Sequence, residues 1–148
     1  MNILGAIIAG IAGTIAISMV MAMAPRMGMP KMDIVELLST MFGKPNKILG
    51  WMMHLMMGVV FALLYSYAWS LGFGSASWHS GLIFGAIHWV IVGVMMAVIP
   101  LMHAGIKNGD VDPPGLWMTK QGGLMSFVGG LMGHMVFGLV VALVYPLF

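Results

Sequence analysis

The sequence has no cysteine and very few charged residues. Without cysteine it can form no disulfide bridge, thiolate nucleophile or cysteine-ligated metal centre. Six of its 148 residues are Lys or Arg and four are Asp or Glu, only 7% of the chain, whereas a soluble domain usually carries about 25%. So few charges cannot cover a water-facing surface or form the basic patch that binds nucleic acid. A soluble globular domain, a disordered chain and a nucleic-acid-binding module are therefore excluded.

Long apolar runs take the place of the missing charges, and 61% of the residues are hydrophobic. A bilayer core about 30 Å thick requires about 20 apolar residues per helix. None of the runs alternates apolar and polar residues as a β-barrel strand does. We expect an all-α membrane protein, a bundle of four transmembrane helices forming a single membrane domain over residues 1–148. The four uncharged runs are Ile3–Ala24, Ile48–Leu71, Gly81–Met102 and Leu124–Phe148.

The basic residues lie in only two of the connections between these runs. The first connection holds four of them and the third holds two: Arg26, Lys31, Lys44 and Lys47, then Lys107 and Lys120. Loops that carry Lys and Arg stay on the cytoplasmic side of a membrane. This asymmetry predicts a multi-pass protein with the first and third connections in the cytoplasm and both termini outside it. Because the first run has no Lys or Arg before it, we expect it to be a retained helix and not a signal peptide.

The first connection also predicts a short helix over residues 32–43. Asp33 can cap its start, Glu36 stands at the capping-box position three residues later, and Gly43 can end it. Its apolar residues share one face, so we expect it to lie on the membrane surface. The third connection, residues 103–123, contains two adjacent prolines and is expected to be an irregular loop with a rigid turn.

A repeat at an offset of 80 positions relates the second and fourth runs. Two segments of 16 residues align without gaps, and eight pairs are identical: Gly50/Gly130, Met52/Met132, His54/His134, Gly58/Gly138, Val60/Val140, Ala62/Ala142, Leu63/Leu143 and Tyr65/Tyr145. The match predicts two parallel two-helix units, residues 1–72 and 80–148, related by a pseudo-twofold axis along the membrane normal.

Small residues at helical spacing let membrane helices approach closely. We therefore predict helix-packing roles for Gly50, Gly58, Ala62, Gly130, Gly138 and Ala142. The same faces carry His54 and His134, which the repeat places at one depth. Ionisable groups inside a membrane are functional candidates. Two hypotheses stay open: both imidazoles ligate a haem b between the helices, or both stay neutral and hydrogen-bond neighbouring helices.

Methionine is abundant, with 19 residues. Thioethers and imidazoles are ligands that suit Cu(I), and MxxxM pairs in the second run resemble, over one turn, the filter of eukaryotic high-affinity copper transporters. Methionine also packs adaptably, so a purely structural role is the alternative. The candidate metal ligands are His54, His134, His88, Met95, Met102 and His103.

The four carboxylates, Asp33, Glu36, Asp110 and Asp112, have no partner at catalytic spacing. The glycines near residue 130 belong to a helix face and do not form a phosphate-binding loop. We therefore expect no enzymatic activity.

The segment GMPKMD at Gly28–Asp33 and two His-xxx-Gly-xxx-Ala-Leu-x-Tyr segments, beginning at His54 and His134, resemble an uncharacterised family. Its members are small bacterial inner-membrane proteins with four transmembrane helices and a domain of unknown function. The resemblance covers most of the chain and implies a bacterial cytoplasmic membrane. It brings no activity or site residues with it.

With 21 glycines and no extramembrane domain, the sequence predicts a non-enzymatic protein that acts through helix–helix contacts. Its partners would be the lipid bilayer and either the other subunits of a larger membrane complex, as an accessory subunit, or copies of itself in a homo-oligomer. Nucleic acid is not expected. Two alternatives remain: binding or transport of a small cation, Cu(I), through Met and His residues, and electron transfer by haem b.

Overall fold

Four long helices dominate the computed structural model, which describes all residues 1–148. Each is long and apolar enough to cross a membrane, so the prediction of an all-α protein with four membrane-spanning helices is confirmed. The long helices are α1 (Ile3–Met23), α3 (Lys47–Ser70), α4 (Trp78–Val98) and α6 (Thr119–Val144). The short ones are η1 (Ala24–Met27), α2 (Ile34–Ser39), η2 (Ile99–Leu101), α5 (Ala104–Asn108), η3 (Leu116–Met118) and η4 (Tyr145–Leu147).

Local sequence signals decide where the first two long helices begin. The side chain of Asn2 accepts a hydrogen bond from the backbone N–H of Gly5 and so caps α1. Asn46 caps α3 in the same way, accepting from the N–H of Leu49. Each cap satisfies one of the backbone donors that a helix start leaves unpaired.

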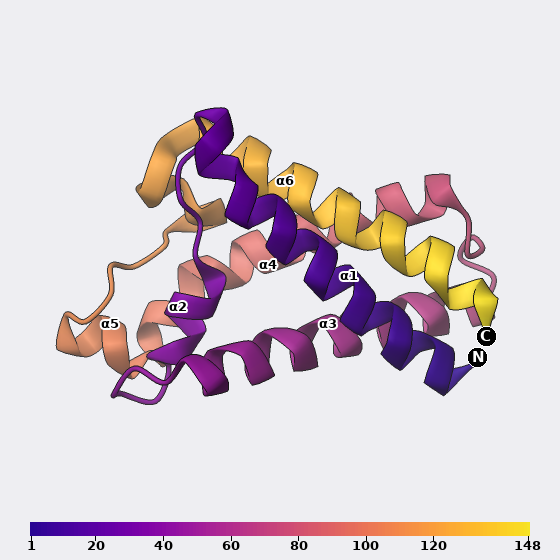
Figure 1. The fold of residues 1–148 in the computed structure, drawn as a ribbon, viewed down its shortest axis with the longest axis horizontal. Coiled ribbons are helices and arrows are strands. Elements are labelled where there is room, and N and C mark those ends of the chain that lie inside the picture. Colours follow the sequence, from indigo (N-terminus) through magenta and orange to yellow (C-terminus); the bar gives the residue numbers. More distant parts are fainter.

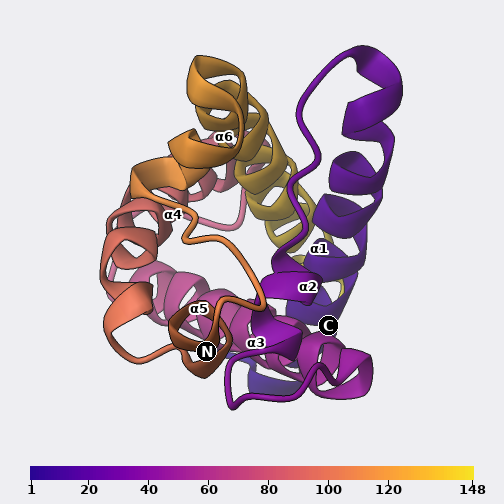
Figure 2. The same ribbon diagram turned by 90° about the vertical axis from the view of Figure 1, so that its left-hand side faces the viewer.

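The four long helices are arranged around a common centre, as the view along the bundle shows (Figure 2). The closest packing joins α1 with α3, α1 with α6 and α4 with α6. Helices α3 and α4 follow one another in sequence but are not packed as closely. Aromatic side chains bridge these two helices: Phe61 stacks on His88 with ring centroids 3.5 Å apart, and Tyr65 meets Phe84 at 5.1 Å. Large side chains at this contact keep the backbones of α3 and α4 apart.

Glycines make the other helix contacts close. A Cβ added to Gly10 of α1 would lie 2.8 Å from the carbonyl oxygen of Gly58 in α3, and one added to Gly58 would collide with Thr14. In the second half, Gly138 of α6 lies equally close to Gly81 of α4. Backbones can approach this closely only where no side chain stands between them.

The remaining predicted packing positions are also in contact with neighbouring elements. Gly50 lies against Val35 and Ser39 of the first connection, and Gly130 lies beneath the ring of Trp89. Ala62 and Ala142 are buried in the hydrophobic core.

The two-repeat architecture remains a prediction. Gly58 and Gly138 both lie at close helix crossings, but Gly58 meets Gly10 and Thr14 whereas Gly138 meets Gly81 and Gly85, and these partners do not correspond at an offset of 80. A twofold axis would also require α3 and α4 to pack as α1 and α6 do. They do not, so the packing of the two halves is not symmetrical.

The first connection forms a shorter helix than the expected 32–43. The side chain of Asp33 accepts from the N–H of Glu36, 2.8 Å away, as the capping signal predicts, but α2 ends at Ser39. Turns follow, and the carbonyl of Ser39 accepts from the N–H of Asn46. Leu37 is buried within the protein and α2 packs on α3, so its apolar face serves internal packing.

The third connection contains the short α5 and an irregular segment leading to η3. Trp117 and Met118 adopt left-handed backbone angles, with φ of 49° and 56°. The chain then bends again at Gly122 and Gly123 before the apolar part of α6. This segment is therefore largely irregular, as expected, although the short helix α5 was not foreseen.

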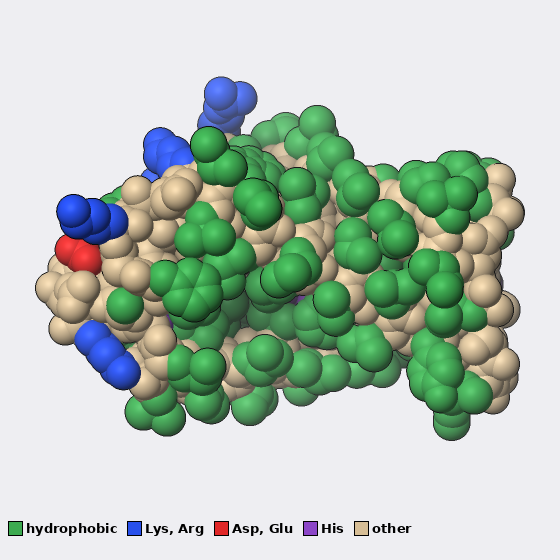
Figure 3. All heavy atoms as spheres, turned by 90° about the horizontal axis from the view of Figure 1, so that it is seen from below, with side chains coloured by type: hydrophobic (Ala, Val, Ile, Leu, Met, Phe, Trp, Pro, Cys, Tyr) green, Lys and Arg blue, Asp and Glu red, His purple; other side chains and the backbone are tan.

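Charge is confined to one end of the bundle. In the space-filling view, the Lys, Arg, Asp and Glu side chains in sight gather at the end that carries α2 and α5, and hydrophobic side chains cover much of the rest (Figure 3). Both termini lie at the opposite end (Figure 1). The basic connections and the termini are thus on opposite sides of any membrane that the helices span.

Candidate functional site

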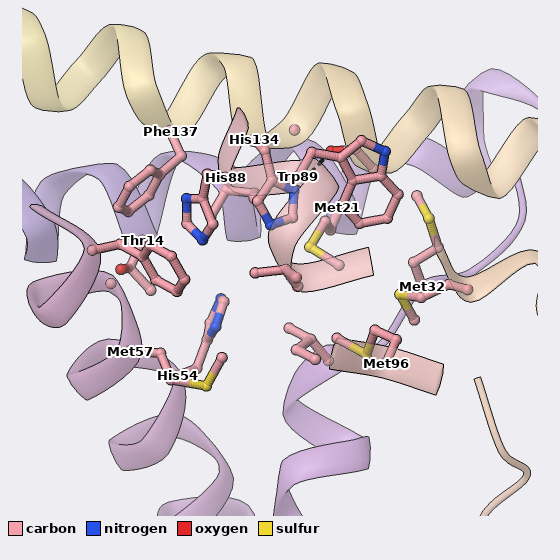
Figure 4. A pocket seen from close by; sticks show the side chains of 18 residues that line it. Thr14, Met21, Met32, His54, Met57, His88, Trp89, Met96, His134 and Phe137 are labelled. Carbon is pink, nitrogen blue, oxygen red and sulfur yellow. Dashed lines mark hydrogen bonds between the residues drawn. The ribbon is translucent and has the colours of Figure 1, made fainter. Parts of the chain in front are cut away.

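A small cavity lies inside the bundle, lined by side chains from all four long helices (Figure 4). Its volume is about 50 Å³. A buried water molecule requires about 10–15 Å³ of such volume, so the cavity has room for about three or four. Most of the wall is apolar, and the polar groups in it are few.

Three histidines from three helices meet at this cavity, which we call the histidine cavity: His54 of α3, His88 of α4 and His134 of α6. Their imidazoles surround one open space in Figure 4. The rings of His88 and His134 are close, with centroids 4.7 Å apart and planes nearly perpendicular. The repeat predicted that His54 and His134 share a depth, and both do line this cavity. His88, which belongs to the same predicted group of metal ligands, joins them here.

Each histidine uses one ring nitrogen to bond the protein. The hydroxyl of Ser18 donates its proton to the carbonyl oxygen of Thr14, so towards His54 it can only accept. Nε2 of His54, 3.2 Å away, is therefore the protonated nitrogen, and Nδ1 keeps its lone pair. Nδ1 of His134 donates to the carbonyl oxygen of Gly130 at 2.8 Å, which leaves the lone pair on Nε2.

His88 is held in the same manner. Its Nδ1 lies 3.2 Å from the hydroxyl of Tyr65, while its Nε2 has no hydrogen bond to the protein. Phe61 stacks against one face of the ring. All three histidines are thus fixed through one nitrogen, and the other nitrogen has no protein partner.

Aromatic rings and thioethers complete the wall. Trp89 lies against His134 with centroids 4.9 Å apart, and its indole N–H is buried without a partner. The thioethers of Met21 and Met57 border the open space (Figure 4). The donor set is therefore made of neutral nitrogen and sulfur atoms.

A larger cavity of about 560 Å³ lies at the charged end. It shares Met21, Met32 and Ile34 with the histidine cavity and also reaches Ser18, the partner of His54. We call this space the vestibule. Its charged lining residues are Lys31, Asp33, Glu36, Lys47 and Asp110.

The acidic residues at the vestibule surround a lysine. Nζ of Lys31 lies 3.3 Å from carboxylate oxygens of both Asp33 and Glu36. Hydrogen bonds to these two carboxylates, Asp33 first, raise the pKa of Lys31 above its usual value of 10.5. All three side chains are largely exposed, so their mutual attraction is screened by water.

Towards the termini the cavity is closed by packed side chains. Tyr65, Trp69 and Phe137 belong to one buried cluster with small residues from α1, α3 and α6. The indole N–H of Trp69 donates to the hydroxyl of Ser80 at 2.8 Å, which satisfies it within the core. We call this cluster the aromatic plug. The histidine cavity is therefore bordered by the vestibule on the charged side and by the plug on the other.

Three of the six predicted metal ligands do not line the histidine cavity, so the prediction that all six share one site is wrong. Met95 is 51% and Met102 75% exposed on the outside of the bundle. His103 is fully buried and uses both ring nitrogens, since Nε2 donates to the carbonyl oxygen of Leu37 and Nδ1 accepts from the N–H of Ile106. It caps α5 and has no lone pair left for a metal. No three His, Asp or Glu side chains form a preformed metal centre.

Met21, Met57 and Trp89 were not predicted as site residues. Met57 was visible in the MxxxM pairs, but nothing in the sequence distinguishes the methionines that face the interior from those that face lipid. Ser18, which orients His54, could have been found because it follows Thr14 at a spacing of four in α1.

Comparison with known proteins assigns the chain to a family but gives it no activity. No curated protein and no solved structure matches this chain. One family model, described as a family of unknown function (DUF6789), matches residues 1–148. The chain, a four-helix protein with an internal histidine cavity, therefore belongs to the DUF6789 family of unknown function.

Proposed function

We propose that this protein is a non-enzymatic, multi-pass membrane protein that binds a small ligand in the histidine cavity, reached through the vestibule. One observation carries the proposal. His54, His88 and His134 converge on one internal space, and each presents a ring nitrogen that the protein leaves without a partner.

Three unpaired ring nitrogens inside a membrane protein lower its stability unless something binds them. Polar groups inside an apolar bundle that lack hydrogen bonds destabilise the folded state. A bound ligand or a few water molecules would satisfy the free nitrogens. A porphyrin is far larger than the cavity of about 50 Å³, so the geometry does not support haem b.

The remaining polar groups favour binding over catalysis. The hydroxyls of Thr14 and Ser18 donate to backbone carbonyls at 2.7 Å, and the imidazole beside Ser18 turns its protonated Nε2 towards it, so it cannot take the proton of that hydroxyl. The carboxylates lie at the vestibule and not in the histidine cavity. The cavity thus offers ligand donors but no hydroxyl activated by a neighbouring base.

A second candidate is a role through helix contacts, as an accessory subunit of a membrane complex or as a homo-oligomer. The observation in its favour is the looser contact between α3 and α4. The face seen in Figure 3 is hollowed near its middle and, apart from its charged end, is mostly covered by hydrophobic side chains. A helix from another subunit would increase the packing there. For both candidates we place the protein in a bacterial cytoplasmic membrane, with the vestibule on the cytoplasmic side.

Chemical labelling distinguishes these candidates, because the chain has no cysteine of its own. Met57→Cys places a thiol in the histidine cavity, and the matched control Ala62→Cys places one in the aromatic plug. A small cationic methanethiosulfonate is added separately to each side of oriented vesicles. We expect Met57→Cys to react only from the charged side and Ala62→Cys to remain unmodified. If Met57→Cys is as unreactive as Ala62→Cys, the cavity is closed and the helix-contact role is favoured.

A further inference from the structure

We propose that the histidine cavity is a site for a soft monovalent metal ion, copper(I). The ligands would be Nε2 of His88, Nε2 of His134 and a thioether sulfur from Met21 or Met57. This inference rests on the proposed function and identifies its ligand. It differs from the ligand set expected from sequence, because Met95, Met102 and His103 have no part in it.

The first argument is how the two imidazoles are held. A histidine that ligates a metal almost always donates its other ring N–H to a carbonyl, carboxylate or water, which fixes the ring orientation. His134 shows this arrangement, since Nδ1 donates to the carbonyl oxygen of Gly130 and Nε2 is free. Nδ1 of His88 lies 3.2 Å from the hydroxyl oxygen of Tyr65, and in the tautomer in which Nδ1–H donates to that oxygen, Nε2 keeps its lone pair for a metal.

The second argument is the chemistry of the donors. Thioethers favour Cu(I), and imidazoles bind copper and zinc alike. Besides Met21 and Met57, the wall includes Met32 and Met96, whereas it has no Asp or Glu. A divalent ion buried among neutral donors would keep two uncompensated charges, and a monovalent ion keeps only one. The cavity therefore favours Cu(I) over Zn²⁺.

The third argument is geometric. The rings of His88 and His134 are already neighbours, with centroids 4.7 Å apart. His54 stands across the cavity and remains bonded to Ser18, in agreement with the absence of a preformed three-histidine centre. An unbranched thioether side chain can change rotamer at little cost, so Met21 or Met57 can complete the coordination without backbone movement.

The vestibule suits the approach of a cation. Three carboxylates and two lysine side chains line it. The lining therefore carries one net negative charge, and a negative lining at the mouth of a cleft raises the local concentration of cations. Met21 borders both spaces and so provides a soft ligand between the mouth and the two histidines.

The test is a titration of the purified full-length protein with silver(I), a stable monovalent substitute for copper(I), in a buffer free of halide and thiol. The number of silver ions bound per chain is measured by mass spectrometry. The affinity for copper(I) is measured in a separate experiment, by competition with a copper(I) chelator under reducing conditions. We expect one ion per chain and no comparable binding of Zn²⁺.

The variants separate ligation from packing. His134→Asn retains an amide donor for the carbonyl of Gly130, and His88→Asn retains a polar group for Tyr65, while both remove Nε2. Loss of an outer partner of a metal ligand typically weakens binding about 10–100-fold, so loss of the ligand itself should weaken it by more than about 100-fold. The matched controls are His79→Asn and Met95→Leu, both at exposed positions, which should bind as the unmodified chain does.

Folding of each variant is checked by its elution profile and its unfolding midpoint. The proposal is overturned if silver fails to bind, if both Asn variants bind it undiminished, or if Met95→Leu weakens binding as much as they do.

X-ray absorption of the copper-loaded protein should show nitrogen and sulfur neighbours of the metal, and the sulfur signal should weaken in Met21→Leu or Met57→Leu. A spectrum without sulfur would also overturn the ligand set. Failure to bind metal while Met57→Cys is still labelled from the charged side would refute copper(I) and leave the proposed ligand-binding role intact.

Discussion

Gly138 of α6 is the position where one added methyl group most directly tests how the bundle is packed. A Cβ there would collide with the carbonyl oxygen of Gly81 and lie 2.9 Å from the backbone nitrogen of Gly85. Both neighbours are backbone atoms of α4, so only separation of the two helices relieves the clash. Gly133 on the same helix is the matched control, because its Cβ would meet only the side chain of Ile17, at 3.2 Å.

The expected difference follows from two opposing effects. Replacing a helical glycine by alanine favours the helix by about 1 kcal/mol, and this gain is the same at both positions. Overpacking a tight contact destabilises by about 1–3 kcal/mol, and this loss applies to Gly138 alone. We therefore expect the free energy of unfolding of Gly138→Ala to lie about 1–3 kcal/mol below that of Gly133→Ala.

The free energy of unfolding is measured by adding sodium dodecyl sulfate to the protein in mild detergent micelles and following the fluorescence of its five tryptophans. Comparing two alanine variants of one helix removes the effect of helix propensity from the difference. Equal stability of the two variants, or greater stability of Gly138→Ala, would refute the close α4–α6 contact on which the shape of the cavity depends.

Three further predictions concern the ends of the bundle. A membrane-impermeant maleimide added to intact cells should label Ser75→Cys but not Lys44→Cys, and the reverse pattern would contradict the proposed orientation. His103→Ala should lower the free energy of unfolding by about 1–3 kcal/mol, because two backbone groups lose their buried partner; an unchanged midpoint in the same detergent titration would contradict this. The carboxylate neighbours of Lys31 raise its pKa. Its ion pairs therefore stabilise the folded protein at any pH below the usual pKa of 10.5, and this stabilisation disappears as the pH rises through the raised pKa. The stability difference between Lys31→Gln and the unmodified chain should therefore persist at neutral pH and shrink only in strong alkali, as thermal unfolding across pH would show.

From the sequence alone it was possible to predict how many helices are long and apolar enough to cross a membrane, their approximate limits and the segregation of charge. The run expected at Ile48–Leu71 is the helix Lys47–Ser70, and the run expected at Ile3–Ala24 is the helix Ile3–Met23. These properties are local, since they depend on how many consecutive apolar residues match the thickness of a bilayer. The helix cap formed by Asp33 could also be predicted from the sequence, because it involves residues only three positions apart.

Only the tertiary structure decided which polar side chains share a site. His88 and His103 both belong to the predicted metal group, yet one lines the cavity and the other caps a short helix. Likewise Met57 borders the cavity while Met95 lies on the outside. In a soluble protein the polar face of a helix points to water, but in lipid both faces are apolar and hydrophobicity does not mark the interior. Close contacts of small residues decide which face turns inward, and those contacts depend on helices far apart in the sequence.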